Sequence, residues 1–190
     1  MVTNQNRMRK VIAAINMTLD GFCDHTAGIA DDELHQHYNE LLRSSDVILY
    51  GRITFQLMEY WAHVVKNPTG NNSVDEFAAT MDNIPKIVFS RTLKNVEWKT
   101  AKLAKGDIKD EVLRLKQEAG ASILVGSPSL IVTLMNLDLI DEYQLCIQPI
   151  VLGNGLPLFK DVEGRNDLIL SRSKTFGSGA IILYYEAEKK

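Results

Sequence analysis

A short apolar run that ends on a glycine and passes directly into a helix constrains this chain more than any other stretch. Val47 to Tyr50 have the β-propensity and the length of a buried strand. Gly51 breaks the run, and Arg52 opens a helical pattern with Phe55 on its apolar side. The first N–H groups of a helix are unpaired and carry positive potential, so this turn suits an anion such as a phosphate. An ordinary turn with a surface arginine is the alternative that this stretch leaves open.

The composition excludes several classes of protein. The 190 residues are 45% hydrophobic, which is enough for one sizeable core, and we expect a single domain over 1–190. A net charge of −3 without a basic run argues against nucleic acid as a partner. No apolar stretch reaches the roughly 18 residues of a membrane span, and the start of the chain does not look like a secretory signal. We therefore expect a cytoplasmic protein.

Neither the cysteines nor the histidines have the spacing of a metal site. Cys23 and Cys146 lie far apart and match no Cys-x-x-Cys pattern, so we expect reduced thiols. His35 and His37 are two positions apart, which on a helix points them to different sides. The sequence predicts no metal.

Strand and helix patterns alternate along most of the chain. Helices are predicted to begin near Asp31 or Asp32, Arg52, Asp75, Asp107 and Ser127. Strands are predicted at 10–16, 47–50, 86–90, 122–125 and 141–152, with a polar surface excursion at 64–74 and a closing hairpin over 168–185. This order is typical of an α/β fold with a mainly parallel central sheet, helices on both faces and an antiparallel C-terminal hairpin.

Suggestive residues follow the carboxyl ends of the predicted strands, where such sheets bind ligands. They are Gly51-Arg52-x-Thr54, Ser90-Arg91 and Gly126-Ser127. Two helix N-termini can face a pyrophosphate, while the arginines and Ser90 can hold a further phosphate, such as the 2′-phosphate of NADPH. The Gly-x-Gly-x-x-Gly fingerprint of dinucleotide-binding folds is absent.

Further motifs occur in a familiar order along the chain. They are TLDGF at 18–22, YGRITF at 50–55, EYW at 59–61, VFSR at 88–91, VGSPSL at 125–130 and LIDEYQLCIQPIVLGNGLPLF at 139–159. With them the chain resembles the riboflavin-biosynthesis reductase domain family, the RibD C-terminal domain, over nearly its whole length. This family shares the three-layer dihydrofolate reductase-like fold, so the resemblance implies a domain core at about 9–186.

The resemblance also implies an activity and a cofactor. It implies an NADPH-dependent reductase that transfers hydride to a pterin- or pyrimidine-like small molecule, usually as a homodimer. By motif, Asn16 and Thr18 would lie near the nicotinamide, and Ser90 and Arg91 would grip the 2′-phosphate. The remaining cofactor contacts implied by the motifs are Gly51, Arg52, Thr54, Gly126 and Ser127.

The substrate half departs from the family pattern. Where the biosynthetic reductases commonly place a glutamate this chain has Val125, and where they carry an acidic pair it has Gln56 and Leu57. The catalytic residue is therefore unassigned. The candidates are Asp20, Asp32 and His35 for catalysis, and Asp20 and Trp61 for substrate contact. An Asp-Gly turn, a helical surface histidine and a buried aromatic are the structural alternatives for Asp20, His35 and Trp61.

Several functions follow from these observations. The first is an NADPH-dependent reductase of a small pterin- or pyrimidine-like heterocycle, with the substrate unassigned. The second is 5-amino-6-(5-phosphoribosylamino)uracil reductase of riboflavin biosynthesis, against which Val125 counts. A non-catalytic nucleotide-binding protein is an alternative from another class, and a dihydrofolate reductase is a weaker one.

Overall fold

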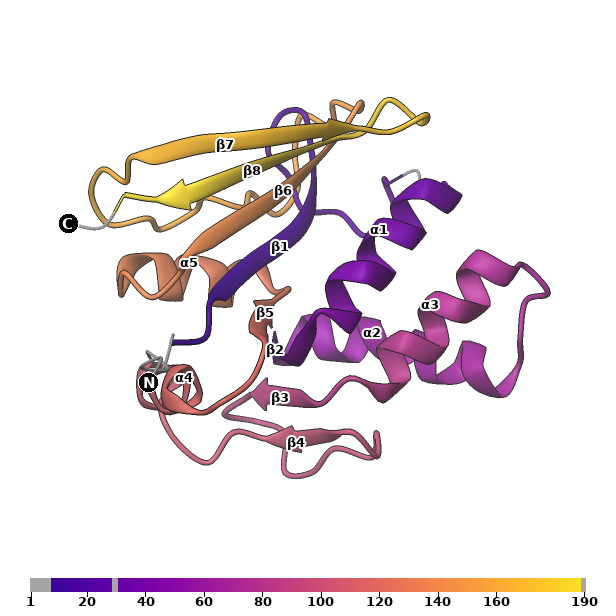
Figure 1. Cartoon of the computed structure of the whole chain (residues 1–190), viewed down its shortest axis with the longest axis horizontal. Coiled ribbons are helices and arrows are strands. Elements are labelled where there is room, and N and C mark those ends of the chain that lie inside the picture. Colours follow the sequence, from indigo (N-terminus) through magenta and orange to yellow (C-terminus); the bar gives the residue numbers. More distant parts are fainter. Residues whose placement is uncertain (1–7, 29–30, 189–190) are drawn as a thin grey trace, which may run out of the picture.

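A twisted sheet of eight strands runs through the middle of the molecule, as Figure 1 shows. The computed structural model describes residues 8–28 and 31–188. The strands are β1 Val11–Thr18, β2 Ser45–Gly51, β3 Lys86–Phe89, β4 Ala101–Leu103, β5 Ser122–Val125, β6 Glu142–Gln148, β7 Leu168–Thr175 and β8 Ile181–Ala187. Their order across the sheet is β4-β3-β2-β5-β1-β6-β8-β7. The strands from β4 to β6 in this order pair in parallel, and β8 and β7 add an antiparallel hairpin.

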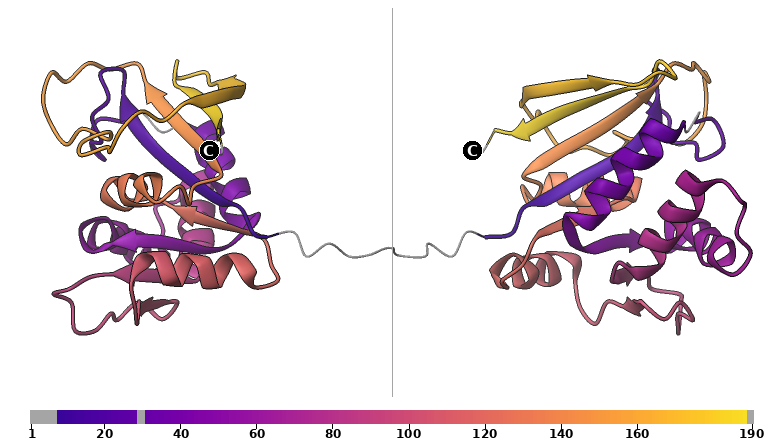
Figure 2. Two further views of the ribbon diagram at one scale, coloured as in Figure 1. Left: turned by 90° about the vertical axis from the view of Figure 1, so that its left-hand side faces the viewer. Right: turned by 45° about the vertical axis from the view of Figure 1, so that its right-hand side comes forward.

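Helices cover both faces of the sheet. They are α1 Asp32–Arg43, α2 Arg52–Lys66, α3 Asn72–Asn83, α4 Ile108–Gln117 and α5 Pro128–Asn136. Helices α1, α2 and α3 lie on one face, and α4 and α5 lie on the other, as the right-hand view of Figure 2 shows. The predicted α/β architecture with helices on both faces and an antiparallel C-terminal hairpin is therefore confirmed.

The central strands are apolar on both sides because both of their faces are covered. In β2, Ile48 and Tyr50 join the core beneath α1, α2 and α3, whereas Val47 and Leu49 join the core beneath α4 and α5. Successive side chains of a strand point to opposite faces, so one continuous apolar run serves two cores.

Two of the predicted boundaries are wrong. The excursion predicted at 64–74 is mostly helical, because α2 runs on to Lys66 and α3 already begins at Asn72. Val64 is buried in this last turn of α2, and the Asn71 side chain caps α3. The strand predicted at 141–152 ends at Gln148, since Pro149 has no N–H group to continue the ladder.

The two edges of the sheet differ in length. Strand β4 has 3 residues and forms one edge, whereas β7 has 8 residues and forms the other. Every residue of β7 after Leu168 is exposed, including Arg172 and Lys174. Among the described residues, no helix has the length and apolar character needed to cross a membrane.

A buried lysine ties α3 to the sheet. The Lys86 side chain has no solvent exposure, and its Nζ donates hydrogen bonds to the carbonyl oxygens of Met81 at 2.5 Å and Ile84 at 2.8 Å. The ammonium also lies 3.9 Å from the centre of the Trp98 ring. Burial lowers the pKa of Lys86 to about 8. The lysine satisfies carbonyls that the C-terminal turn of a helix leaves unpaired.

We expect Lys86→Met to lower the free energy of unfolding by about 1–3 kcal/mol, because buried carbonyl groups lose their donor. Urea denaturation measures this difference. Lys99→Met, at an exposed position, is the control and should leave the midpoint unchanged. Equal midpoints for the two variants would contradict the stabilising role of Lys86.

A buried histidine makes the stability depend on pH. His37 packs its ring against Tyr38, Phe176 and Tyr184. Burial, assisted by the charge of Lys174, lowers the pKa of His37 to about 4 from the ordinary value of 6.5. The unfolded chain therefore takes up this proton first as the pH falls, and the folded state loses stability between about pH 6.5 and pH 4.

We expect His37→Gln to flatten the loss of stability on acidification through this range, because the variant has no group to protonate at that position. Denaturation curves recorded between pH 7 and pH 4 measure the slope for each protein. His63→Gln, at an exposed position of α2, is the control and should follow the parent chain. Parallel decline of all three proteins would refute the assignment.

Candidate functional site

A cavity of about 350 Å³ opens between the sheet and the helices α1, α2 and α3. It lies at the carboxyl ends of β1, β2, β5 and β6, where Asn16, Tyr50, Val125 and Gln148 line it. The wall that the helices contribute is aliphatic and aromatic, and consists mainly of Leu34, Leu41, Leu42, Ile53, Leu57, Met58, Trp61, Phe77 and Met81. Its volume and apolar character are those of a small-molecule site.

Neutral polar side chains stand where β1 and β6 end. The Tyr38 hydroxyl donates to Asn16 Oδ1 at 3.1 Å, and Gln148 Nε2 donates to the same oxygen at 3.4 Å. Because the oxygen accepts both bonds, the NH₂ group of the exposed Asn16 side chain is the donor that it offers to a ligand. The sequence predicted Asn16 for the cofactor but missed Tyr38, whose place in the apolar stripe of α1 hid its hydroxyl. It also missed Gln148, although a polar residue at the end of an otherwise apolar strand is a signal that could have identified it.

His35 is a second polar side chain that α1 brings to the cavity, beside Tyr38. Its ring centre lies 5.7 Å from that of Phe77 and 6.4 Å from that of Trp61. Burial lowers the pKa of His35, although Asp32 and Asp31 act in the opposite direction. The imidazole is therefore neutral at pH 7, and it can donate from one nitrogen and accept at the other.

Two of the helices differ from the others at their N-termini. Asp31, Asn71 and Asp107 cap α1, α3 and α4 through side-chain hydrogen bonds, and each of these helices has an acidic residue in its first turn. In the described chain, α2 and α5 have neither a side-chain cap nor an acidic residue in the first turn. Their first N–H groups therefore retain the positive potential that attracts an anion.

A buried hydrogen bond joins the starts of these two helices. Ser127 has only 1% of its surface exposed, and its Oγ accepts from the Gly51 N–H group at 2.9 Å. Ser127 occupies the predicted N-cap position of α5, but its hydroxyl oxygen accepts the hydrogen bond from Gly51 and none from an N–H group of α5. A Cβ atom at Gly126 would lie 3.0 Å from the Tyr50 ring, so a larger residue here would require the buried ring to shift.

The predicted phosphate-binding residues gather beside these helix ends. Gly51 pairs with Phe89 across the sheet, so the residues that follow β2 and β3 lie side by side. Arg52 and Arg91 are both exposed there, outside the lining of the cavity. Ser90 already accepts a hydrogen bond from the Leu93 N–H group at 2.9 Å, which shapes the turn after β3.

Thr18 and Asp20 hold a turn together. The buried Thr18 hydroxyl donates to Asp20 Oδ1 at 2.6 Å, and Asp20 Oδ2 accepts from the Gly153 N–H group at 2.7 Å. The hydrogen bond from Thr18, followed by that from Gly153, lowers the pKa of Asp20. This carboxylate is not part of the described cavity lining. Its hydrogen bonds join the loop after β6 to the turn after β1. This is the structural role that the sequence analysis gave as the alternative to a catalytic Asp20.

The structure separates the three catalytic candidates. Asp32 accepts a hydrogen bond from the Ser73 hydroxyl at 2.5 Å on the exposed side of α1, and like Asp20 it is absent from the described lining. His35 lines the cavity together with Trp61 and Thr54. No group of three or more His, Cys, Asp or Glu side chains in the described residues is arranged to hold a metal ion.

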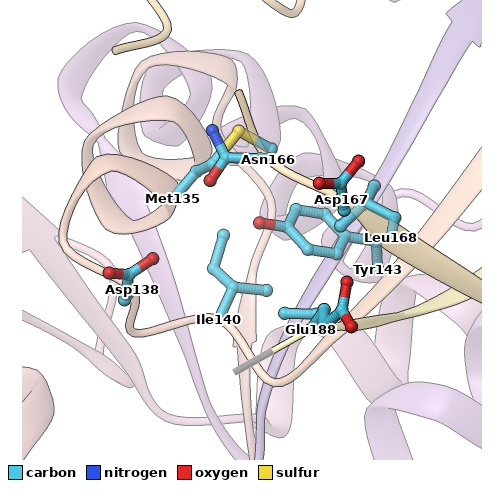
Figure 3. A pocket seen from close by; sticks show the side chains of 9 residues that line it. Met135, Asp138, Ile140, Tyr143, Asn166, Asp167, Leu168 and Glu188 are labelled. Atoms are coloured by element: carbon cyan, nitrogen blue, oxygen red, sulfur yellow. The ribbon is translucent and has the colours of Figure 1, made fainter. Parts of the chain in front are cut away.

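A second cavity, of about 40 Å³, lies near the C-terminal end of α5 and the start of β7. Figure 3 shows the Tyr143 ring and Ile140 within it, and the carboxylates of Asp138, Asp167 and Glu188 around it. This volume has room for little more than ordered water. It is too small for a nucleotide.

We expect Asp20→Ala to speed hydrogen exchange at the amides of Leu152 and Gly153, because both amides lose the carboxylate that accepts their bonds. Asp110→Ala, at an exposed position of α4, is the control and should leave exchange in this loop unchanged. Mass spectrometry of the exchanged peptides gives the result. Unchanged exchange at both amides would exclude the fastening role of Asp20.

Comparison with known proteins places this fold among described families. Residues 9–182 match the family model of the RibD C-terminal domain. Over 188 residues the chain is 35% identical to the protein named "Uncharacterized protein YyaP" of Bacillus subtilis (strain 168), covering 97% of this chain and 98% of the relative.

Solved structures share the architecture at low sequence identity. A putative riboflavin biosynthesis protein from Shewanella sp. PV-4 is 20% identical with a TM-score of 0.73, over 95% of this chain and 99% of that one. Dihydrofolate reductase from Enterococcus faecalis, solved with NADP(H), is 10% identical with a TM-score of 0.63, over 95% and 97% of the two chains. The predicted dihydrofolate reductase-like fold is thereby confirmed.

Proposed function

The chain belongs to the RibD C-terminal domain family, and we propose that it is an NADPH-dependent reductase that transfers hydride to a small pterin- or pyrimidine-like heterocycle. One observation carries the cofactor half of the proposal. The N-termini of α2 and α5, without side-chain caps or first-turn acids in the described chain, begin side by side next to an apolar cavity. Two such helix ends fit a diphosphate, which offers them its negative charges.

Neighbouring side chains fit the remaining phosphate of NADPH. Arg52 and Arg91 supply two exposed guanidinium groups, and Ser90 adds a hydroxyl directly after the end of β3. Charge-assisted hydrogen bonds to a phosphate are among the stronger polar interactions of proteins. NADH lacks this phosphate, so these residues would make the protein prefer NADPH.

In this proposal the cavity holds the nicotinamide ring of NADPH and the ring of the hydride acceptor. NADPH supplies the hydride when it is bound, and the protein has to orient the acceptor beside the nicotinamide and exclude bulk water. The apolar wall with Trp61 and Phe77 suits flat rings. Asn16 offers an NH₂ donor near the end of β1, in a cavity that the first turns of α2 and α5 also line. His35 is the described cavity residue best able to hold or relay a proton at a ring nitrogen.

The cavity argues against the specific riboflavin step. The substrate of 5-amino-6-(5-phosphoribosylamino)uracil reductase carries a phosphate, and the described cavity lining contains no lysine or arginine.

The family resemblance also leads us to propose a cytoplasmic homodimer, which size-exclusion chromatography with light scattering can test. A nucleotide-binding protein without turnover would bind NADPH but reduce none of the heterocycles offered.

We expect Arg91→Ala to weaken NADPH binding by about tenfold to a hundredfold, because a charge-assisted contact to the 2′-phosphate is lost. The affinity for NADH should not change. Isothermal titration with both cofactors measures the two dissociation constants. Arg165→Ala, at an exposed arginine that pairs with Asp167, is the control and should bind as the parent does.

Equal affinity of the parent chain for NADPH and NADH, or failure to bind either, would overturn the cofactor assignment. Loss of NADPH absorbance with pterin or pyrimidine acceptors tests turnover in a separate assay. Binding of NADPH without turnover of any acceptor would favour the non-catalytic alternative.

A further inference from the structure

The cavity itself points to a narrower substrate class, and this inference rests on the reductase function proposed above. We propose that the substrate is an uncharged planar ring with an apolar substituent, and that the cavity rejects rings that carry a phosphate or carboxylate tail. The argument uses three features: the chemistry of the wall, the charges along the lining and the side chains that α1 sends inward.

The wall suits an apolar substituent. Leu57, Met58 and Trp61 of α2 and Phe77 and Met81 of α3 all line the cavity. The centres of the Trp61 and Phe77 rings lie 4.6 Å apart at an interplanar angle of 72°. Apolar surface buried against such a wall stabilises the complex, whereas a charged group placed there loses its water without gaining a partner.

The charges along the lining act against anions. Among the described lining residues there is no lysine or arginine, and the one carboxylate is that of Asp24. A hydrogen bond from the Thr26 hydroxyl, followed by one from its N–H group, lowers the pKa of Asp24, which therefore stays ionised. A phosphate or carboxylate tail would meet a like charge here, and the histidines His25 and His35 are the only described lining side chains that could carry a positive charge beside it.

Helix α1 brings a neutral imidazole, and no carboxylate, to the described lining of the cavity. Asp31 Oδ1 accepts from the Leu34 N–H group and Oδ2 from that of Ser178, and Asp32 accepts from Ser73. Both acids are thus engaged outside the described lining, and the titratable side chains of α1 that line the cavity are His35 and Tyr38. A neutral imidazole recognises an uncharged ring through hydrogen bonds, but it does not compensate for a protonated ring as a carboxylate does.

A matched pair of probes tests the class. We would measure the binding of a propyl-substituted pteridinedione, and of the same ring with a phosphonopropyl chain, to the NADPH-loaded protein by titration calorimetry. The two probes share one ring and differ in the charge of the tail. We expect the uncharged probe to bind at least about tenfold more tightly, which corresponds to about 1.4 kcal/mol.

A charge-introducing variant locates the effect in the cavity. Leu57→Arg places a cation on the wall, and we expect it to reduce the preference for the uncharged probe by about tenfold or more. Leu113→Arg in α4 is the matched control, because Leu113 is 38% exposed and Leu57 37%, and Leu113 lies on the other face of the sheet. The control should keep the preference of the parent chain.

Each outcome decides one of the two proposals. Equal or tighter binding of the phosphonate by the parent chain overturns the substrate class, and so does NADPH binding with no affinity for either probe. Equal responses of Leu57→Arg and Leu113→Arg would show that selectivity arises outside the cavity, which also overturns it. Binding of the uncharged probe by a protein that does not bind NADPH would instead overturn the reductase function and leave the ring preference standing.

Discussion

The hydrogen bond from the Gly51 N–H group to Ser127 Oγ is the contact on which the candidate site depends. It crosses from the turn after β2 to the turn after β5 and is buried between two neighbouring parallel strands. In such surroundings a satisfied polar contact is strong and an unsatisfied one is costly, so the two turns are held in one arrangement. That arrangement sets the starts of α2 and α5 side by side, and with them the edge of the cavity.

The described site divides into two halves of opposite chemistry. The half beside Arg52 and Arg91 is open and rich in donors, which is what a phosphorylated cofactor requires. The half enclosed by α1, α2 and α3 is apolar, and its polar groups are mostly neutral. The sequence analysis found departures from the family pattern at Val125, Gln56 and Leu57. Val125 and Leu57 line this second half, whereas Gln56 lies outside the described lining.

Periodicity and turn residues were sufficient to predict an α/β fold with a mainly parallel sheet, because most strands and helices have local signals, whereas the dihydrofolate reductase-like fold was predicted from the family resemblance. The apolar run before Gly51, the cap at Asp107 and the glycines between β7 and β8 are such signals. The end of α2 was missed because polar residues of an exposed helix look like a loop.

The site was less accessible to prediction, because its contacts join distant segments. The sequence contains nothing that would show Ser127 bonding to Gly51, Tyr38 reaching Asn16 or Asp20 fastening Gly153.

The open edges of the sheet bear on the solubility of the protein. An exposed edge strand offers unpaired backbone groups to which another chain can add, as in fibrous aggregates. Strand β4 limits this risk because it is only 3 residues long. Strand β7 is longer and exposes Ile169 and Leu170, but Arg172 and Lys174 follow in the same strand. Two like charges repel an approaching copy of the strand, so these residues act as gatekeepers that keep the sheet from growing beyond its own chain.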